Sequence, residues 1–339
     1  MGIRRVGLWA AAAALFGFAA QGLAQGQGAP SASTPGGVSG GAYPSRTIKL
    51  IVPFTPGSAT DIIARSVSDR LGASLGQSVI VENRPGAGGT IGTAVIAKAA
   101  PDGYTLGVVS AGHAINPAIY DNLPYDTAKD LGGVIPLASL PSVLIVSPAL
   151  GVRSVPEFIA LAKSKPGAFN FTSAGVGSAA HISAEKFRAA TGINAVHVPL
   201  KGAPEMVTET VAGRTHFALL GITSALPAVR DGRLIGLAVS STKRSLGLPD
   251  LPTMAEVGLP AAEFNFWIGM LAPSQTPRAI VSRLHDEVAR VLLVPEVRER
   301  LANLGAEPMP MSTEQFDAYM REQLVSVGGV MRAAGVKGN

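Results

Sequence analysis

The chain of 339 residues contains no cysteine. This absence excludes disulfide bonds, structural zinc sites built on thiolates and thiol catalysis. It also excludes a lipoprotein anchor, because such an anchor needs a cysteine to acylate. The stability of the folded chain must therefore come from its packed core.

Charged residues are sparse, at 15% of the chain, and no dense cluster of Lys and Arg occurs. The 28 basic and 23 acidic residues give a formal net charge of +5, but two of the basic residues, Arg4 and Arg5, lie in a predicted leader. A nucleic-acid-binding domain carries a basic patch or stripe. We therefore expect no nucleic-acid partner.

Long hydrophobic runs are also missing, apart from one near the N-terminus. Arg4 and Arg5 precede an apolar run over residues 6–20, and the small residues Gly22 and Ala24 follow it. This pattern predicts a signal peptide over residues 1–24, cleaved after Ala24. The run is shorter than the ~20 residues that cross a bilayer. Residues 25–42, rich in Gly, Ser, Pro and Ala, predict a flexible leader. We expect a soluble mature protein in the periplasm.

Short apolar runs alternate with helical patterns from residue 43 onward, and this alternation predicts an α/β fold with parallel layers. Ile63, Val67, Leu71 and Leu75 recur every four residues and give the clearest helical signal. The predicted strands are 47–54, 78–83, 104–110, 142–147, 169–174, 215–221, 234–240 and 266–273. The predicted helices are 63–75, 92–99, 155–163, 179–190, 204–212, 277–292, 295–304 and 313–333.

The last three helices follow one another without a strand between them. This order would be explained if the C-terminal helices packed against the lobe formed by the N-terminal part of the chain. We therefore expect two lobes joined by a hinge at two chain crossings. Lobe 1 would comprise residues 43–143 and 268–339, and lobe 2 residues 144–267.

The first candidate site is the segment between the strand at 47–54 and the helix that follows it. Thr55, Gly57, Ser58 and Thr60 lie there, where a strand end and a helix N-terminus meet. Such a junction offers unpaired backbone N–H groups to an anion. Ser58 and Asp61 fit a capping pattern, so we expect Asp61 to bond the loop backbone. The alternative is a capped helix start with no ligand.

The second candidate site has similar chemistry and lies between residues 173 and 181. Gly175 and Gly177 permit close backbone approach, Ser173 and Ser178 carry hydroxyls, and a helix begins near Ala179. Two such loops on opposite lobes would clamp a carboxylate with neutral donors. His181 would donate either to the ligand or to a neighbouring carbonyl.

A third candidate is the segment at residues 197–205. Pro204 suits a first helical turn, which leaves Gly202 and Ala203 to present backbone groups. Lys201 would face either the ligand or the solvent.

Motifs of common enzyme classes are missing from the part of the chain that is predicted to fold. The pattern G-x-S-x-G occurs only at residues 37–41, within the predicted flexible leader. No H-E-x-x-H or Walker sequence occurs, and the histidines at 113, 181, 197, 216 and 285 never pair at i, i+4 spacing. The glycines at 86–92 do not complete a dinucleotide fingerprint, because its third position falls on Ile91. We expect no metal, no cofactor and no catalytic residue.

Several segments together resemble the Bug family of periplasmic receptors, the binding components of tripartite tricarboxylate transport systems. They are YPSRTIKLIVPF, PGSATDIIAR, VENRPGAGGTIG, PDGYTL, FNFTSAGVGSAAH, VPLKG and LPTMAEVGLP, in the family's order from Tyr43 onward. The resemblance implies a type II periplasmic-binding-protein fold with two α/β lobes and a central cleft. It also implies that the loops at residues 55–60 and 173–181 grip one ligand carboxylate, partly through ordered water.

The resemblance adds further cleft-lining segments at residues 111–116 and 221–224. Some positions depart from the family's pattern: Ser58 stands where many members have glycine, and Leu200 stands where many have tyrosine. No acidic residue occurs at residues 219–224, which disfavours an amino-acid ligand. The full set of predicted ligand-binding residues is Thr55, Gly57, Ser58, Thr60, Ala111, Asn116, Ser173, Ala174, Gly175, Gly177, Ser178, His181, Lys201, Gly202, Gly221 and Thr223.

The expected function is capture of a small organic carboxylate in the interlobe cleft and its delivery to a tripartite tricarboxylate-type transporter. We expect a monomer that is not an enzyme and whose partners are membrane permease subunits. Two alternatives remain open. The protein would present its ligand to a sensor kinase, or it would be an exported α/β hydrolase.

Overall fold

β1 (Ile48–Val52) lies between two parallel neighbours, β2 (Val79–Asn83) and β3 (Thr105–Ser110). Four of its five residues are buried, which suits a central strand of a covered parallel sheet. We describe the fold from a computed structural model, whose described residues are 43–338. The predicted signal peptide and leader lie outside the described residues.

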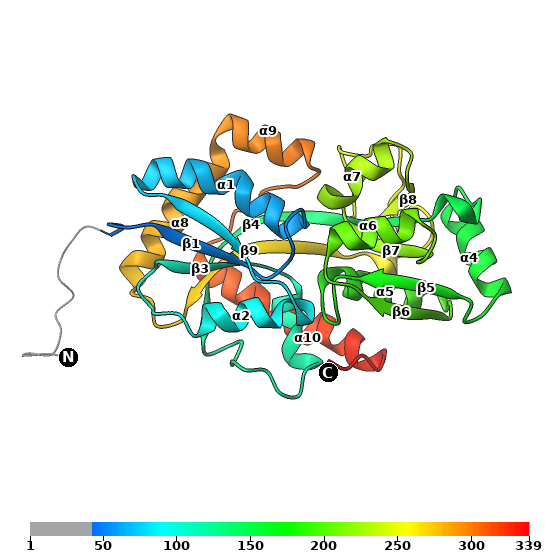
Figure 1. The fold of residues 1–339 in the computed structure, drawn as a ribbon, viewed down its shortest axis with the longest axis horizontal. Helices are drawn as coiled ribbons and strands as arrows, with labels where there is room; N and C mark the ends of the chain where they lie inside the picture. The colour runs from blue at the N-terminus through cyan, green and yellow to red at the C-terminus, as the bar shows by residue number, and fades with distance from the viewer. Residues whose placement is uncertain (1–42, 339) are drawn as a thin grey trace, which may run out of the picture. The chain divides into compact units, whose positions relative to one another are not determined.

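Two long strands extend the sheet beyond β3. β9 (Asn265–Pro273) pairs antiparallel with β3 and with β4 (Leu131–Val146). Residues 142–146 of β4 then pair antiparallel with β7 (Phe217–Gly221) and β8 (Ile235–Val239). β4 therefore belongs to both groups of strands, and Figure 1 shows it running between them.

The second parallel group comprises β7, β5 (Phe169–Ser173) and β6 (Ala195–Pro199). The strand order is β2-β1-β3-β9-β4-β7-β5-β6, with β8 paired to β4. The prediction of parallel layers holds for these two groups but is wrong for β4 and β9. The chain leaves the first group along β4 and returns along β9, so these neighbouring strands run in opposite directions.

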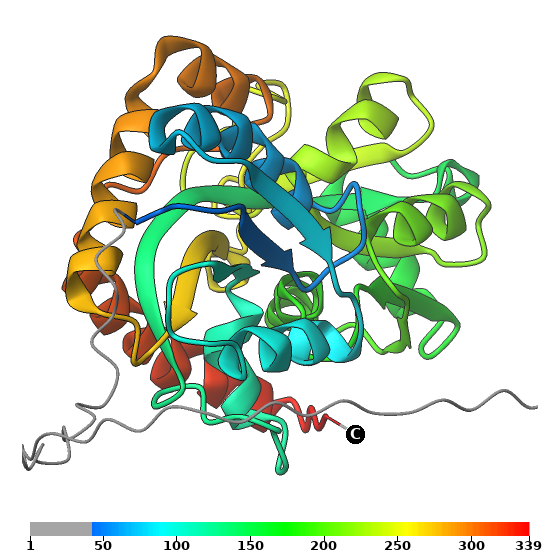
Figure 2. The ribbon, with the colours of Figure 1, turned by 60° about the vertical axis from the view of Figure 1, so that its left-hand side comes forward.

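The helices cover both groups of strands. α1 packs against β1, and α8 and α9 pack against α1, whereas α4 to α7 surround β5 to β8 (Figure 1). α8 and α10 both pack along β4 (Figure 2). Their bounds are α1 (Ala59–Leu75), α2 (Thr90–Ala97), α3 (Gly112–Ile115), α4 (Val155–Ser164), α5 (Ala179–Thr191), α6 (Ala203–Val211), α7 (Ile222–Arg230), α8 (Arg278–Leu293), α9 (Pro295–Asn303) and α10 (Thr313–Ala333). None of the described helices is long and apolar enough to cross a membrane.

Every predicted helix and strand occurs close to its predicted position, but four elements were missed in whole or part. The sequence did not predict β6, α3, α7 or residues 131–141 of β4. Pro136 and Pro141 lie in that part of β4, and proline argues against a regular strand because it has no N–H to donate. The strand accommodates Pro136 next to register shifts in its pairing with β9.

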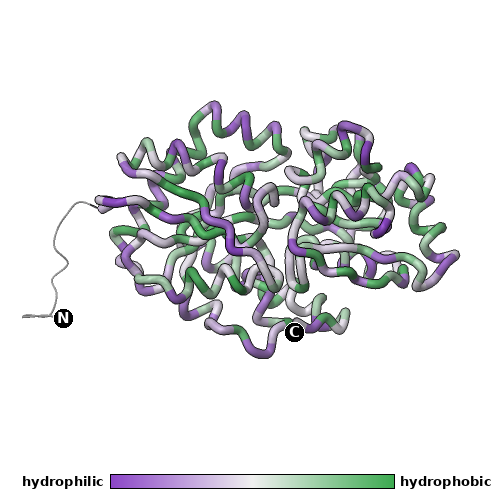
Figure 3. Tube along the Cα trace, in the orientation of Figure 1, coloured by the Kyte–Doolittle hydropathy of each residue, from purple (hydrophilic) through white to green (hydrophobic). Residues whose placement is uncertain are grey.

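The apolar residues of the strands and of the helix faces against them form the core, as Figure 3 indicates. Ile63, Val67 and Leu71 of α1 are fully buried, as their spacing predicted. A second cluster packs around Phe158 and Phe217, among β5, β7, α4 and α5.

Ser240 joins the two segments at which the chain passes between the strand groups. Its hydroxyl accepts a hydrogen bond from the Ser142 N–H at 2.8 Å and donates one to the Phe264 carbonyl at 2.5 Å. The predicted lobe boundaries, at 143/144 and 267/268, fall close to this point, within β4 and β9. The division into lobes stays a prediction.

Candidate ligand-binding site

The first strand-to-helix junction connects β1 to α1. Ser58 is the N-cap of α1, and its hydroxyl accepts a hydrogen bond from the Asp61 N–H at 3.3 Å. The Asp61 carboxylate accepts one from the Gly57 N–H at 2.9 Å. Gly57 has a positive φ of 79°, which favours glycine. The predicted backbone contact of Asp61 is confirmed.

Asp61 is fully occupied by the loop and its neighbours. Burial opposes its ionisation, but hydrogen bonds from Arg65, from the Gly57 N–H and from Asn83 outweigh this effect and hold its pKa below the usual value. The Arg65 and Asn83 nitrogens lie 3.0 and 2.9 Å from its Oδ1. Asp61 therefore fixes the loop as a structural carboxylate.

The second junction, between β5 and α5, repeats this local structure. Ser178 is the N-cap of α5, and its hydroxyl accepts a hydrogen bond from the His181 N–H at 3.4 Å. His181 Nδ1 accepts one from the Gly177 N–H at 3.2 Å, and Gly177 has φ 78°. His181 thus takes the place that Asp61 has at the first junction. Because Nδ1 is an acceptor there, it carries no proton.

A buried cluster of side chains supports the second junction from behind. The rings of His181 and His197 stack with centroids 3.9 Å apart. His197 Nε2 lies 2.7 Å from the Ser173 hydroxyl, which donates to the Gly175 carbonyl at 3.0 Å. His197 is therefore the donor to Ser173. Burial, followed by the neighbouring His181, lowers the pKa of His197 to about 3, so its imidazole is neutral at pH 7.

The two junctions open onto one cavity of about 50 Å³. Hydroxyl groups and apolar side chains line it, and none of the lining residues is charged. They are Phe54, Ser58, Ala59, Thr60, Ser110, Ala174, Ser178, Ala179, Ala180, Ala203, Met206, Leu220, Gly221, Ser224 and Phe266.

Four backbone N–H groups at this cavity are free. Ala59 and Thr60 begin α1, and Ala179 and Ala180 begin α5; N–H groups in the first turn of a helix have no partner within the helix. Within residues 43–338 these four also have no partner outside it. The cavity thus receives paired donors from two helix N-termini, each with a partial positive charge.

Five of the predicted site residues line this cavity: Ser58, Thr60, Ala174, Ser178 and Gly221. Others lie in the surrounding contacts between loops. The Gly57 carbonyl accepts a hydrogen bond from the Ser224 hydroxyl at 3.3 Å. A Cβ on Gly202 would lie 1.9 Å from Thr55 Oγ1, so glycine permits this close approach.

The loop at Gly175 and Gly177 packs against the opposite strand group. A Cβ on Gly175 would lie 2.8 Å from the Gly88 nitrogen, and one on Gly177 would lie 2.5 Å from Asn116 Oδ1. The Tyr120 hydroxyl adds a hydrogen bond of 2.9 Å to the Val176 carbonyl.

The remaining predicted residues do not reach the cavity. Ala111 is buried behind it, where its N–H bonds the Trp267 carbonyl. Ser173 and His181 belong to the supporting cluster, and Thr223 is buried. Lys201 is exposed, and its N–H bonds the Glu205 carboxylate.

Ser110, Met206, Leu220 and Phe266 line the cavity but were not predicted. Ser110 is the last residue of β3 and Leu220 the last but one of β7, and the rule that strand ends face the crevice would have found them. Phe266 and Met206 carry no such signal. Within residues 43–338, no group of three His, Asp or Glu side chains is placed to hold a metal ion.

These elements define a solute-binding protein with the fold of the periplasmic binding proteins. Similar solved structures are a protein from R. palustris with adipate (33% identical, TM-score 0.84, covering 87% of this chain and 99% of that one) and MatC from Rhodopseudomonas palustris with bound malate (31%, 0.81, 85% and 99%).

The chain belongs to the tripartite tricarboxylate transporter family receptors, whose family model matches residues 63–336. It is 36% identical to protein BugT of Bordetella pertussis over 302 residues, which cover 88% of this chain and 93% of BugT. The resemblance to the Bug family is confirmed. The family is one of periplasmic solute-binding receptors.

Proposed function

We propose that this protein is an exported receptor that captures a small organic carboxylate between the starts of α1 and α5. The observation that carries the proposal is the set of four free N–H groups, on Ala59, Thr60, Ala179 and Ala180, which meet at one cavity. Hydrogen bonds to a charged partner contribute ~1.5–3 kcal/mol each. A carboxylate, with two oxygens, would accept from both junctions at once.

The ligand class follows from the site's charge and from the relatives. No lining residue is acidic, so nothing there would repel a carboxylate. Structures of two relatives contain adipate and malate, both carboxylates. The apolar part of the ligand would contact Phe54, Met206 and Phe266.

Ligand entry requires the two strand groups to move apart. The cavity of about 50 Å³ is far below the ~300–1,000 Å³ of ordinary ligand pockets. We propose that residues 43–143 with 268–339, and residues 144–267, are the two lobes that move. The bend would fall near Ser142, Ser240 and Phe264, where the chain crosses.

We propose a periplasmic monomer that delivers its ligand to the permease subunits of a tripartite transporter, in keeping with the family. The same fold and family, which are those of binding receptors, favour binding over catalysis. If the receptor serves a sensor kinase instead, the binding site is unchanged and only the partner differs.

The test combines a ligand screen with the removal of single N–H groups. Purified mature protein is screened by thermal shift against mono-, di- and tricarboxylates, and the best ligand is titrated by calorimetry. Ala59→Pro and Ala179→Pro each delete one donor at the first helical position, where proline is tolerated. The preceding residues, Ser58 (ψ 157°) and Ser178 (ψ 156°), already have the extended backbone that proline requires.

Each variant should weaken carboxylate binding about 10- to 100-fold, in line with the loss of one charge-assisted hydrogen bond of ~1.5–3 kcal/mol. Arg278→Pro is the control, because it also deletes the N–H at the first position of a helix, at the exposed start of α8 and away from the cavity; it removes the Arg278–Glu314 ion pair as well. Unchanged affinity in both Ala59→Pro and Ala179→Pro, or no carboxylate bound by the unaltered protein, would contradict the proposal.

A further inference from the structure

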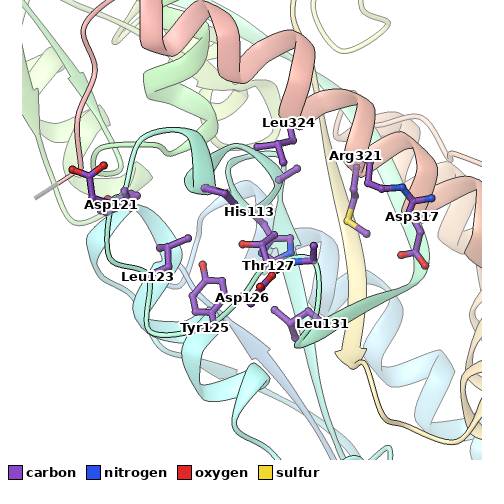
Figure 4. A pocket seen from close by; sticks show the side chains of 15 residues that line it. His113, Asp121, Leu123, Tyr125, Asp126, Thr127, Leu131, Asp317, Arg321 and Leu324 are labelled. Carbon is purple, nitrogen blue, oxygen red and sulfur yellow. Dashed lines mark hydrogen bonds between the residues drawn. The ribbon is translucent and has the colours of Figure 1, made fainter.

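A second cavity, of about 570 Å³, lies among α3, residues 117–131 and α10. It shares no lining residue with the cavity between the two junctions. Figure 4 shows one wall formed by α10, with Asp317, Arg321 and Leu324, and the facing wall formed by the segment that carries Leu123 and Tyr125. Its volume falls within the ~300–1,000 Å³ range of small-molecule sites.

Polar groups are buried at this cavity without partners. His113 is only 5% exposed, and its Nδ1 forms no hydrogen bond with any residue of the described chain. Thr127 is partly buried, and its buried Oγ1 also forms no hydrogen bond with any residue of the described chain. A buried polar atom that is left unpaired destabilises a folded protein. The other ring nitrogen of His113, Nε2, is accessible and also has no hydrogen-bond partner within residues 43–338, so it is the atom that a ligand in the cavity would reach.

His113 is suited to a ligand contact as a neutral group. Burial lowers its pKa to about 4, so the imidazole carries no charge at pH 7 and offers one donor and one acceptor. Its ring lies nearly parallel to that of Tyr125, with centroids 6.4 Å apart. The two rings together line one side of the cavity, where a ligand would contact aromatic surface and a nitrogen of the His113 imidazole.

The rest of the lining is apolar with an excess of carboxylates. Leu123, Leu131, Met320 and Leu324 supply the apolar surface. The charged lining residues are Asp121, Asp126, Asp317 and Arg321. Asp126 is paired with Lys129, which leaves two carboxylates against one guanidinium.

Asp317 is the acid best placed to bind a cation. It lies on α10 on the same face as Met320, Arg321 and Leu324. Its Oδ1 accepts a hydrogen bond from the Gly133 N–H at 2.8 Å. Its other carboxylate oxygen has no hydrogen-bond partner within residues 43–338 and is available to a cation. Burial raises its pKa above the usual value, despite the Gly133 hydrogen bond and Arg321. A nearby cation would favour its ionised form.

We propose that this cavity is a second ligand site, which binds a small amphipathic amine. The apolar body would lie against Leu123, Met320 and Leu324, the ammonium would pair with Asp317, and His113 would bond a polar atom of the ligand. Its ligand class is thus opposite in charge to that of the cavity between α1 and α5.

The test uses two methionine methyl groups as local reporters. In mature protein with ¹³C-labelled methionine methyl groups, Met320 reports on this cavity and Met206 on the cavity between the junctions. Three probes share one phenyl body and differ in the head group: 2-phenylethylamine, 2-phenylethanol and 3-phenylpropanoate. The amine should shift the Met320 signal saturably and leave Met206 unmoved. The alcohol and the anion should bind at Met320 at least tenfold more weakly.

Two variants establish where the amine binds. Asp317→Asn removes the charge but keeps an oxygen for the Gly133 N–H, and it should weaken amine binding at least tenfold while leaving the alcohol unchanged. Asp250→Asn, at an exposed position elsewhere, is its matched control. Leu324→Trp fills the cavity and should abolish the Met320 shift with every probe. Carboxylate binding reported by Met206 should remain in all three variants.

The proposal is overturned if the Met320 shift grows linearly with amine concentration, if the anion binds there as tightly as the amine, or if Asp317→Asn binds the amine like the unaltered protein. Because carboxylate binding is read at Met206, a failure of the proposed receptor function would appear separately.

Discussion

Gly57 and Gly177 adopt the same left-handed backbone conformation, with φ 79° and 78°, and each donates its N–H to the side chain four residues later. Their surroundings differ. A Cβ on Gly177 would lie 2.5 Å from Asn116 Oδ1 and 2.6 Å from Ile119, whereas a Cβ on Gly57 would have Pro204 at 3.5 Å as its only close neighbour within the described residues. Substitutions at the two glycines therefore distinguish the effect of backbone strain, which both would share, from the effect of a steric contact with the opposite strand group, which only a side chain at Gly177 would make.

We predict that Gly177→Ala weakens ligand binding much more than Gly57→Ala. Both substitutions carry the backbone cost of about 1–2 kcal/mol for a side chain in the left-handed region. Only Gly177→Ala also pushes the two strand groups apart. Thermal unfolding of the ligand-free variants should show similar losses, while calorimetry shows at least a tenfold larger loss of affinity for Gly177→Ala. Equal affinities would mean that this contact does not form in the bound protein.

Tyr120→Phe should weaken ligand binding about 2- to 10-fold, because it removes the hydrogen bond to the Val176 carbonyl and with it ~0.5–1.5 kcal/mol of support for the closed arrangement. Tyr43→Phe is the control, since the Tyr43 hydroxyl bonds the Gly103 carbonyl within one strand group. That variant should lower thermal stability and leave affinity unchanged. If both variants bind alike, the Tyr120 contact has no part in closure.

Ser240→Ala should destabilise the fold by about 1–3 kcal/mol for each group that it leaves unpaired, the Ser142 N–H and the Phe264 carbonyl. Denaturant unfolding measures this loss. The control is Ser66→Ala, a buried serine whose hydroxyl bonds only the Ile62 carbonyl of its own helix, where we expect little change. A loss no greater than that of Ser66→Ala would show that the Ser240 link contributes little.

Acidification should destabilise the protein through His197. Its pKa is lowered to about 3 in the folded chain, whereas an unfolded histidine titrates near ~6.5. Between these pH values the unfolded state binds more protons than the folded state. The contribution of His197 to the free energy of unfolding is therefore complete above pH ~6.5 and is lost as the pH drops toward 3. His197→Gln, which keeps a donor for Ser173, should show a shallower fall in unfolding free energy between pH 7 and 4. A slope equal to that of the unaltered protein would show that His197 does not cause the loss of stability.

The local features of the site could be predicted because they depend on neighbours in the chain. Residues 57–61 and 177–181 share the order glycine, serine, alanine, any residue and then an acceptor. Capping of a helix by the preceding serine needs only this short segment. The same reasoning predicted the backbone contact of Asp61 and the strands and helices on either side.

The sequence could not predict which residues from distant elements complete the site. The contact observed for His181 Nδ1 is neither of the two predicted, because this atom accepts a hydrogen bond from the Gly177 N–H, and the ring of His197 on β6 stacks on the imidazole. Phe266 reaches the cavity from β9, more than two hundred residues after Phe54. Such contacts depend on the register of β4 with β9, which no local pattern encodes.

The amino-acid order by itself determined the alternation of strands and helices, the two glycine and serine junctions and the family. These follow from hydrophobic periodicity, helix capping and backbone freedom, which act over a few residues. Only the tertiary structure decided that the two junctions share one cavity, that His181 and Ser173 lie behind it, and that His113 and Asp317 both line a second one. Those arrangements result from packing between elements that are far apart in the chain, where burial and shape select the contacts.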